Sequence, residues 1–279
     1  MFAVIILAAC GIATFAPESK HQPIPVLQIG HVGRPNQIYA TASLVMSVDK
    51  LGLAVFWDPF SGKSIGSMSL LTTSGVSVVA LAPDGRRVYI ATSDDIICAS
   101  VPDGVPIPGW RLPVSGVANL AMSPSGGHLL AVDENDHLQL WSTTTCELEA
   151  STSIDSGSIT CVGISSNGEV VAIGLDTGSI QVRRFHDLAM LRELSKHGDT
   201  VNCVALSHNG KRLVSGSDDY TAIIWYLDGT DKPPHVIRPG PRPVKGVAIT
   251  DSGEYVVTAT SSSTRVWRAE DGEPHSVAS

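Results

Sequence analysis

The sequence predicts an all-β fold in which one small antiparallel sheet is repeated along the chain. The segment from Lys196 to Tyr226 contains three apolar runs separated by turn residues, which is the pattern of a meander of short strands. A glycine in the first of these turns recurs at intervals of 41 to 43 residues. The five equivalent glycines are Gly85, Gly126, Gly168, Gly210 and Gly253. One such sheet cannot bury both of its faces, so we expect the copies to stack on one another.

The best-formed repeat spans residues 196–238. We expect its strands at Val201–Ser207, Arg212–Ser217 and Thr221–Trp225, with a fourth near His235–Ile237. Four short strands that recur about every 42 residues are the sequence signature of a β-propeller, in which each repeat forms one blade.

Residues at the end of the third strand follow the same period. Four repeats carry a tryptophan there, and two others carry Cys98 or Ala99 and Arg183. The tryptophans are Trp57, Trp141, Trp225 and Trp267. In one repeat Gly30-His31 and Trp57-Asp58 bracket the strands, and the 196–238 repeat keeps His197 and its tryptophan.

This pattern resembles the WD repeat, and the resemblance covers nearly the whole chain. It strongly implies a β-propeller of the WD-repeat type. It says little about function, because the same fold serves many unrelated tasks.

The repeat period divides the chain into one propeller domain, residues 1–279, with seven expected blades. Their bounds are 1–29, 30–72, 73–113, 114–155, 156–195, 196–238 and 239–279. We expect His275 to Ser279 to form the fourth strand of the last blade.

The first expected blade is incomplete. Phe15 lies 42 residues before Trp57, which leaves no room for an innermost strand. We therefore expect strands only at Ala3–Ala9, Ile12–Phe15 and Ile24–Ile29, and we expect the chain to be a fragment of a longer protein. The alternative is that the apolar start of the chain is a degenerate signal or anchor, although no basic residue precedes its apolar run.

Composition limits the class of partner and the compartment. The net charge of −8 argues against a nucleic-acid surface. The five cysteines form no Cys-X-X-Cys pair, and the sequence contains no Asn-X-Ser/Thr glycosylation site. Both features favour an intracellular protein, cytoplasmic or nuclear, without membrane attachment. The nine histidines show no metal-binding spacing, so we expect neither a metal nor a cofactor.

The resemblance implies a buried chain of hydrogen bonds in each well-formed repeat. Its members here are the structural tetrad His197, Ser215, Asp219 and Trp225. A His, Ser and Asp could also be interpreted as a hydrolase triad, but no Gly-X-Ser-X-Gly elbow accompanies them. Other repeats keep only part of the set, with Asn135 or Ser261 at the aspartate position.

The resemblance also implies a docking face. In the family, partners commonly bind where the turns between second and third strands meet the loops between blades. The candidate partner-binding residues are Asp94, Asp95, Glu134, Asn135, Asp176 and Asp218. Turn chemistry explains these acidic residues more simply than calcium binding or catalysis does. Trp110 is expected either as an exposed binding residue or as a side chain that covers the core.

The predicted function is a non-catalytic protein-protein interaction scaffold within a larger intracellular complex or multidomain protein. Its partners would be proteins or peptides rather than nucleic acid, a membrane or a small-molecule substrate. The alternative is a propeller enzyme with an active site in the central channel. That alternative needs ionisable residues on the innermost strands, which instead carry mostly apolar and small residues, as in Val117–Met122.

Overall fold

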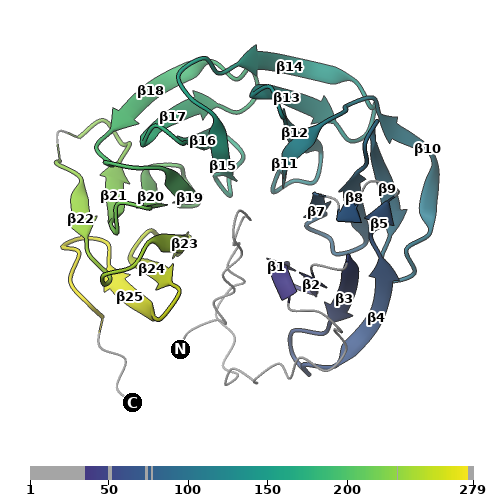
Figure 1. The fold of residues 1–279 in the computed structure, drawn as a ribbon, viewed down its shortest axis with the longest axis horizontal. Coiled ribbons are helices and arrows are strands. Elements are labelled where there is room, and N and C mark those ends of the chain that lie inside the picture. The colour runs from purple at the N-terminus through teal and green to yellow at the C-terminus, as the bar shows by residue number, and fades with distance from the viewer. Residues whose placement is uncertain (1–34, 50–51, 73–74, 77, 231, 276–279) are drawn as a thin grey trace. The chain divides into compact units, whose positions relative to one another are not determined.

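The computed structural model describes residues 35–49, 52–72, 75–76, 78–230 and 232–275 (Figure 1). The regular structure in these ranges consists of β-strands. The described residues up to Ser151 form one compact unit, and those from Thr152 onward form a second.

The first unit contains three four-stranded antiparallel sheets, each a simple meander. Blade 1 consists of β1 (Pro35–Ala40), β2 (Val45–Asp49), β3 (Leu53–Trp57) and β4 (Ser64–Ser69). Blade 2 consists of β7 (Val79–Leu81), β8 (Arg87–Ala91), β9 (Ile96–Ser100) and β10 (Pro106–Leu112). Blade 3 consists of β11 (Val117–Met122), β12 (His128–Asp133), β13 (His137–Ser142) and β14 (Leu148–Ser153). The short strands β5 (Leu71–Thr72) and β6 (Gly75–Val76) pair with each other between blades 1 and 2.

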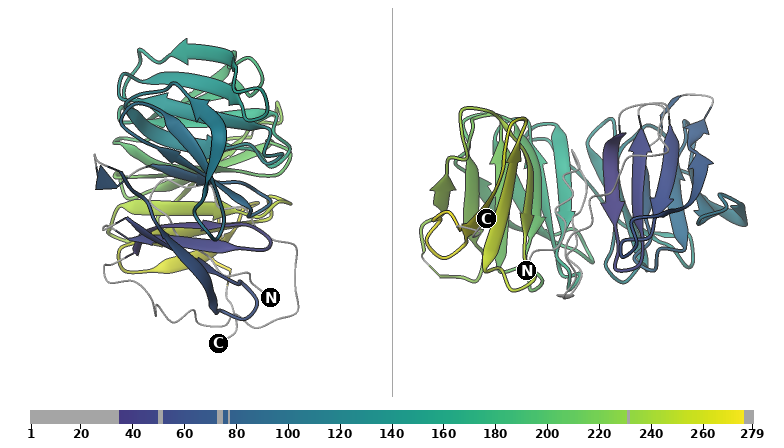
Figure 2. Two further views of the ribbon diagram at one scale, coloured as in Figure 1. Left: turned by 90° about the vertical axis from the view of Figure 1, so that its right-hand side faces the viewer. Right: turned by 90° about the horizontal axis from the view of Figure 1, so that it is seen from below.

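The second unit repeats the same topology. Blade 4 consists of β15 (Ile159–Ile164), β16 (Val170–Leu175), β17 (Ser179–Arg184) and β18 (Met190–Ser195). Blade 5 consists of β19 (Val201–Leu206), β20 (Arg212–Ser217), β21 (Ala222–Tyr226) and β22 (His235–Ile237). Blade 6 consists of β23 (Val244–Ile249), β24 (Tyr255–Thr260) and β25 (Thr264–Arg268), whose strands lie side by side in Figure 2. We call the strands of each blade a to d in chain order.

The predicted all-β class and propeller blades are confirmed. In blade 5, β20 and β22 have the predicted bounds, and the ends of β19 and β21 differ from the prediction by one residue. At the start of the predicted fourth strand of blade 6, Pro274 pairs with Trp267 in an isolated bridge and His275 N–H donates to Val266 O over 2.9 Å. The rest of that strand lies outside the described residues.

The predicted number of blades is wrong, because the described residues form six blades rather than seven. The predicted partial blade rested on the spacing between Phe15 and Trp57. A single aromatic residue at that spacing does not supply the turns and strand pairings that define a meander. The strands expected at Ala3–Ala9, Ile12–Phe15 and Ile24–Ile29 lie outside the described residues.

The recurring turn glycine has a physical cause. Gly85, Gly126, Gly168, Gly210 and Gly253 all have φ between 65° and 75°. This left-handed conformation is accessible to glycine without the steric cost that a Cβ atom would add. Each of these amides donates a hydrogen bond of 2.8 to 3.0 Å to the carbonyl three residues earlier, which closes the a–b turn.

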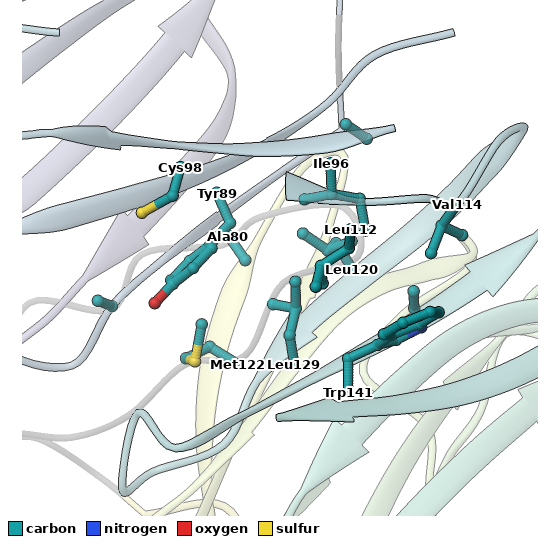
Figure 3. Close-up of a cluster of buried hydrophobic side chains, with 13 residues drawn as sticks. Ala80, Tyr89, Ile96, Cys98, Leu112, Val114, Leu120, Met122, Leu129 and Trp141 are labelled. Atoms are coloured by element: carbon teal, nitrogen blue, oxygen red, sulfur yellow. The ribbon is translucent and has the colours of Figure 1, made fainter. Parts of the chain in front are cut away.

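The core of each unit lies between neighbouring blades. Between blades 2 and 3, Tyr89 and Cys98 pack in one cluster with Leu129 and Trp141 (Figure 3). Strands b and c of blades 1 to 5 are mostly buried, whereas strand d alternates between exposed and partly buried residues in blades 1 and 3. The d strands therefore form the outer edge of each sheet.

Strand a carries a bulge in the same place in several blades. The register of strands a and b shifts around Thr160 in blade 4, Asn202 in blade 5 and Lys245 in blade 6. Thr160 Oγ1 donates to Val201 O, and Asn202 Nδ2 donates to Val244 O over 3.2 Å. In blades 4 and 5 the bulged residue therefore ties its blade to the next one.

Candidate functional site

The four residues of the predicted tetrad meet inside blade 5. His197 Nδ1 lies 2.9 Å from Asp219 Oδ2, and His197 Nε2 lies 2.7 Å from Ser215 Oγ. Trp225 Nε1 donates to the same Ser215 oxygen over 2.8 Å. Because Ser215 Oγ already accepts the indole proton, its own proton points to His197 Nε2. The histidine then carries its proton on Nδ1 and donates it to Asp219.

The turn after strand b completes this network. Thr221 Oγ1 donates to Asp219 Oδ1 over 2.6 Å, and the backbone amides of Gly198 and Thr221 donate to the same carboxylate over 2.9 Å each. Burial alone would raise the pKa of Asp219, but these hydrogen bonds and the one from His197 lower it to about 2. Burial lowers the pKa of His197 despite the neighbouring Asp219. The pair is therefore a neutral imidazole beside an ionised carboxylate at neutral pH.

The connectivity of His197, Ser215 and Asp219 is that of a hydrolase triad, yet the surroundings differ. Ser215 is 0% exposed, and its oxygen is capped by the indole of Trp225. A nucleophilic serine must present its oxygen to a substrate carbonyl. This serine cannot do so, and the arrangement serves to satisfy buried polar atoms.

In the other blades, different residues accept the hydrogen bond from the buried side chain near the end of strand c. Trp57 donates to Ser47 Oγ over 2.7 Å, and Trp267 donates to Thr258 Oγ1 over 2.8 Å. Blades 3 and 4 lack this hydroxyl. Trp141 Nε1 donates instead to Gln139 Oε1 over 3.0 Å, and the buried Arg183 donates to Gln181 Oε1 and Leu188 O. The full tetrad therefore forms in blade 5, while three other blades keep only the tryptophan and an acceptor.

In blade 2 the tryptophan comes from a different strand. Trp110, on strand d, packs against Tyr89 with ring centroids 4.9 Å apart and donates to Thr143 O over 2.8 Å. Of the two predictions for Trp110, the covering side chain is correct. The hydroxyl of Tyr89 is buried without a hydrogen-bond partner in the described part of the chain.

Asp94 and Asp95 differ although they are adjacent. Asp94 is exposed in the b–c turn of blade 2, as expected. Asp95 is 6% exposed, accepts a hydrogen bond from Thr92 Oγ1 over 2.6 Å and pairs with Arg111 Nε over 2.6 Å. The expectation that Asp95 is an exposed turn residue is wrong, because its carboxylate is needed to hold the turn to strand d.

Glu134 and Asn135 are exposed in the b–c turn of blade 3. The carboxylate that shapes this turn belongs to Asp133, whose Oδ1 accepts from the amides of Asn135 and His137 over 2.9 and 3.0 Å. Asn135 therefore does not act as the counterpart of Asp219, although the repeat places it at that position.

Asp176 and Asp218 lie in the b–c turns of blades 4 and 5. Asp176 is exposed, and its Oδ1 accepts from the amide of Ser158 over 2.9 Å. Asp218 is partly exposed, and its Oδ1 accepts from Asn202 Nδ2 over 2.8 Å and Lys245 Nζ over 2.6 Å. Burial alone would raise the pKa of Asp218, but these two hydrogen bonds lower it.

The predicted docking residues thus belong to two groups, one in each unit. Within each unit the b–c turns are bonded to the loop that enters the same blade. The amides of Glu134, Asp176 and Asp218 donate to Gly116 O, Ser158 O and Thr200 O over 2.8 to 3.0 Å. In both units these turns and loops therefore lie at the same end of the blades.

Sequence reasoning missed Tyr220, which is 52% exposed in the b–c turn of blade 5 and has a φ of 68°. The sequence does contain a sign of it, because Tyr220 is an aromatic residue in a turn where other repeats have Asp or Gly. In the described ranges, no three His, Cys, Asp or Glu side chains are placed to share a metal ion, and no helix is long and apolar enough to span a membrane. The four described cysteines are free thiols.

Comparison with known proteins identifies the repeat. Residues 189–226 match the family model "WD domain, G-beta repeat". The chain is 30% identical over 121 residues to Protein SPIRRIG of Arabidopsis thaliana, which covers 40% of this chain and 3% of that protein. It is 32% identical over 120 residues to BEACH domain-containing protein A2 of Arabidopsis thaliana, covering 39% of this chain and 3% of the relative.

A third relative is apoptotic protease-activating factor 1 of Danio rerio. The identity is 26% over 152 residues, which covers 54% of this chain and 12% of that protein. The matched regions are therefore small parts of much longer relatives. Together, the matched repeat and the repeated four-stranded meanders support a β-propeller of the WD-repeat family.

Proposed function

We propose that this chain is a non-catalytic scaffold that binds other proteins or peptides within a larger intracellular complex or multidomain protein. The observation that carries the proposal is the rigid presentation of exposed side chains on the b–c turns. Glu134 and Asp176 are exposed, yet their backbone amides are hydrogen-bonded to the neighbouring loop. A turn whose backbone is already ordered loses little further backbone entropy when a partner binds.

The chemistry of the tetrad supports a non-catalytic role. His197 and Ser215, the residues best suited to nucleophilic catalysis, are buried and bonded to each other. WD-repeat propellers generally bind other proteins or peptides, and the relatives are far longer than the matched region. Both facts support a module that works beside other domains or subunits.

The proposal is tested by affinity purification with two matched triple variants. The first is Asp94→Ala, Glu134→Ala and Asn135→Ala, on the b–c turns. The control is His208→Ala, Lys211→Ala and Glu254→Ala, which are exposed residues at or beside a–b turns. Proteins that bind the wild-type chain should be lost with the first variant and kept with the control, while both variants melt like the wild type.

Two results would contradict the proposal. Loss of binding with the control variant alone would place the docking face at the a–b turns. A wild-type chain that retains no protein reproducibly above a tag-only control would argue against the scaffold function itself.

A further inference from the structure

Tyr220 occupies a backbone position that other blades fill with different residues. The equivalent positions of the b–c turn are Gly52, Asp136 and Gly178, and all four residues have positive φ, between 59° and 84°. Glycine adopts this region freely and aspartate tolerates it, whereas an aromatic residue is disfavoured there. Turn formation alone therefore does not explain a tyrosine at this position.

The side chain of Tyr220 is not used by the fold. It is 52% exposed, and it makes no hydrogen bond or ring contact with any other described residue. In contrast, Tyr89 packs on Trp110, and Tyr226 donates its hydroxyl proton to Ala269 O over 3.1 Å. An exposed aromatic ring without an internal partner is the type of residue that anchors protein interfaces.

The turn holds this ring in a defined place. The amide of Asp219 donates to Ser217 Oγ over 3.1 Å, and the amide of Thr221 donates to Asp219 Oδ1 over 2.9 Å. Both neighbours of Tyr220 are thereby fixed, and Asp219 is also bonded to His197. The ring is therefore presented on a turn whose two flanking residues are held by hydrogen bonds.

Two carboxylates beside the turn each have an oxygen that accepts no hydrogen bond from the described residues. Asp218 uses Oδ1 for Asn202 and Lys245, while its Oδ2 has no partner among the described residues. Asp199 is exposed, and its backbone carbonyl accepts from Ser217 Oγ over 2.9 Å, which places it next to the same turn. Among the described residues, its carboxylate accepts a hydrogen bond only from the amide of Thr200, through Oδ1.

We propose that Tyr220 anchors a partner segment that presents an arginine or lysine. The cation would lie over the face of the Tyr220 ring and donate to Asp199 or to the free oxygen of Asp218. This combination of ring and carboxylate suits a cation. The negative charge of the whole chain, −8, favours the approach of a basic partner. The inference rests on the proposed function and names the chemistry of the partner at this turn.

The test uses two short capped peptides and the full ¹⁵N-labelled chain. One peptide alternates glycine and arginine, and the other alternates glycine and glutamate. The arginine peptide should shift the amide resonances of residues 217–221 in a saturable manner, and the glutamate peptide should not. Tyr220→Gly should weaken the binding about five-fold, which corresponds to the loss of one cation–π contact. Tyr220→Phe should retain the binding.

The matched control is Phe60→Ser, because Phe60 is an equally exposed aromatic residue, at 59%, on a c–d turn of blade 1. This variant should bind the arginine peptide like the wild type. Tyr220→Gly should melt at the wild-type temperature or above it, because glycine relieves the strained conformation.

Several outcomes would overturn the inference. They are a lower melting temperature for Tyr220→Gly, equal shifts with both peptides, or unchanged binding after Tyr220→Gly. These results would leave the scaffold function intact, since that function is tested separately by the capture of partners through the b–c turns of blades 2 and 3.

Discussion

Two blade interfaces are filled by large side chains from opposite sides. At the interface between blades 4 and 5 the large residue belongs to the second blade, and at the interface between blades 1 and 2 the large residues belong to the first. In the first, Trp225 on strand c of blade 5 faces the small pair Ala172 and Val182 of blade 4. In the second, Ala99 takes the position of Trp225. Trp225 pairs with Leu213 on strand b, and Ala99 pairs with Val88, the equivalent residue of blade 2.

The residues of blade 1 that correspond to Ala172 and Val182 are Met46 and Phe56, and both are fully buried in the same cluster as Ala99. A large residue on one side is thus matched by small residues on the other. The family tryptophan is therefore one of several ways to fill the space between two sheets. The volume has to be filled to the density of a protein interior, and either sheet can supply the atoms.

The largest expected effect is the loss of the tryptophan itself. Trp225→Ala should destabilise the chain by roughly 3–5 kcal/mol, because the small pair that faces it cannot close the cavity. Urea unfolding followed by tryptophan fluorescence and circular dichroism measures this. The control Ala99→Gly removes only one methyl group from the equivalent place and should cost far less. Equal losses would show that the two positions are not packed differently.

The second expected effect tests the exchange of volume directly. Ala99→Trp alone should overpack the interface of blades 1 and 2 and destabilise it by about 1–3 kcal/mol. Combining it with Met46→Ala and Phe56→Val, which copies the blade 4 pair, should recover part of that loss. A positive coupling of about 0.5–3 kcal/mol in the mutant cycle would confirm that the sides compensate. Additive effects would contradict it.

The third effect concerns the tetrad, which the interface of blades 1 and 2 lacks. Asp219→Ala should cost about 1–3 kcal/mol, because it removes the acceptor shared by His197, Gly198 and Thr221. Thermal unfolding at neutral pH measures the change. Wild-type melting behaviour would show that the hydrogen-bonded chain does not stabilise blade 5.

The tetrad should also make blade 5 sensitive to acid. The pKa of His197 lies below its ordinary 6.5, so the unfolded chain takes up this proton first and stability declines as the pH falls below that value. The pKa of Asp219 lies at about 2 instead of 3.8, so its contribution is present above pH 3.8 and is lost as the pH falls towards 2. Hydrogen exchange should therefore show β20 losing protection before β8 on acidification. His197→Gln should reduce this difference, and identical profiles in the wild type would contradict the expectation.

The smallest effect separates two neighbouring carboxylates. Asp94→Ala should change stability by no more than about 0.5 kcal/mol, as is usual for an exposed turn residue. Asp95→Ala should cost more, about 1–3 kcal/mol, because Thr92 loses its buried acceptor. Chemical unfolding of the two single variants measures the difference, and each variant serves as the control for the other.

The all-β class, the recurrence of one meander and the strands of blade 5 could all be predicted from the sequence. These features were predictable because they depend on local geometry. A glycine such as Gly210 is required wherever the a–b turn enters the left-handed region, so its spacing reveals the repeat. The residues of the tetrad were also predictable, because His197, Ser215, Asp219 and Trp225 lie within one repeat, at positions that the family pattern specifies.

The pairing of side chains across blades could not be predicted, because it depends on how the folded sheets pack. In the sequence, Ala99 stands where other repeats have a tryptophan. The volume that the tryptophan would fill is taken by Met46 and Phe56, which lie more than 40 positions away in the chain. The burial of Asp95 depends on Arg111 in strand d, and the packing of Trp110 depends on Tyr89 and on the next blade. Such contacts follow from volume and hydrogen bonding between sheets, and the repeat period carries no information about either.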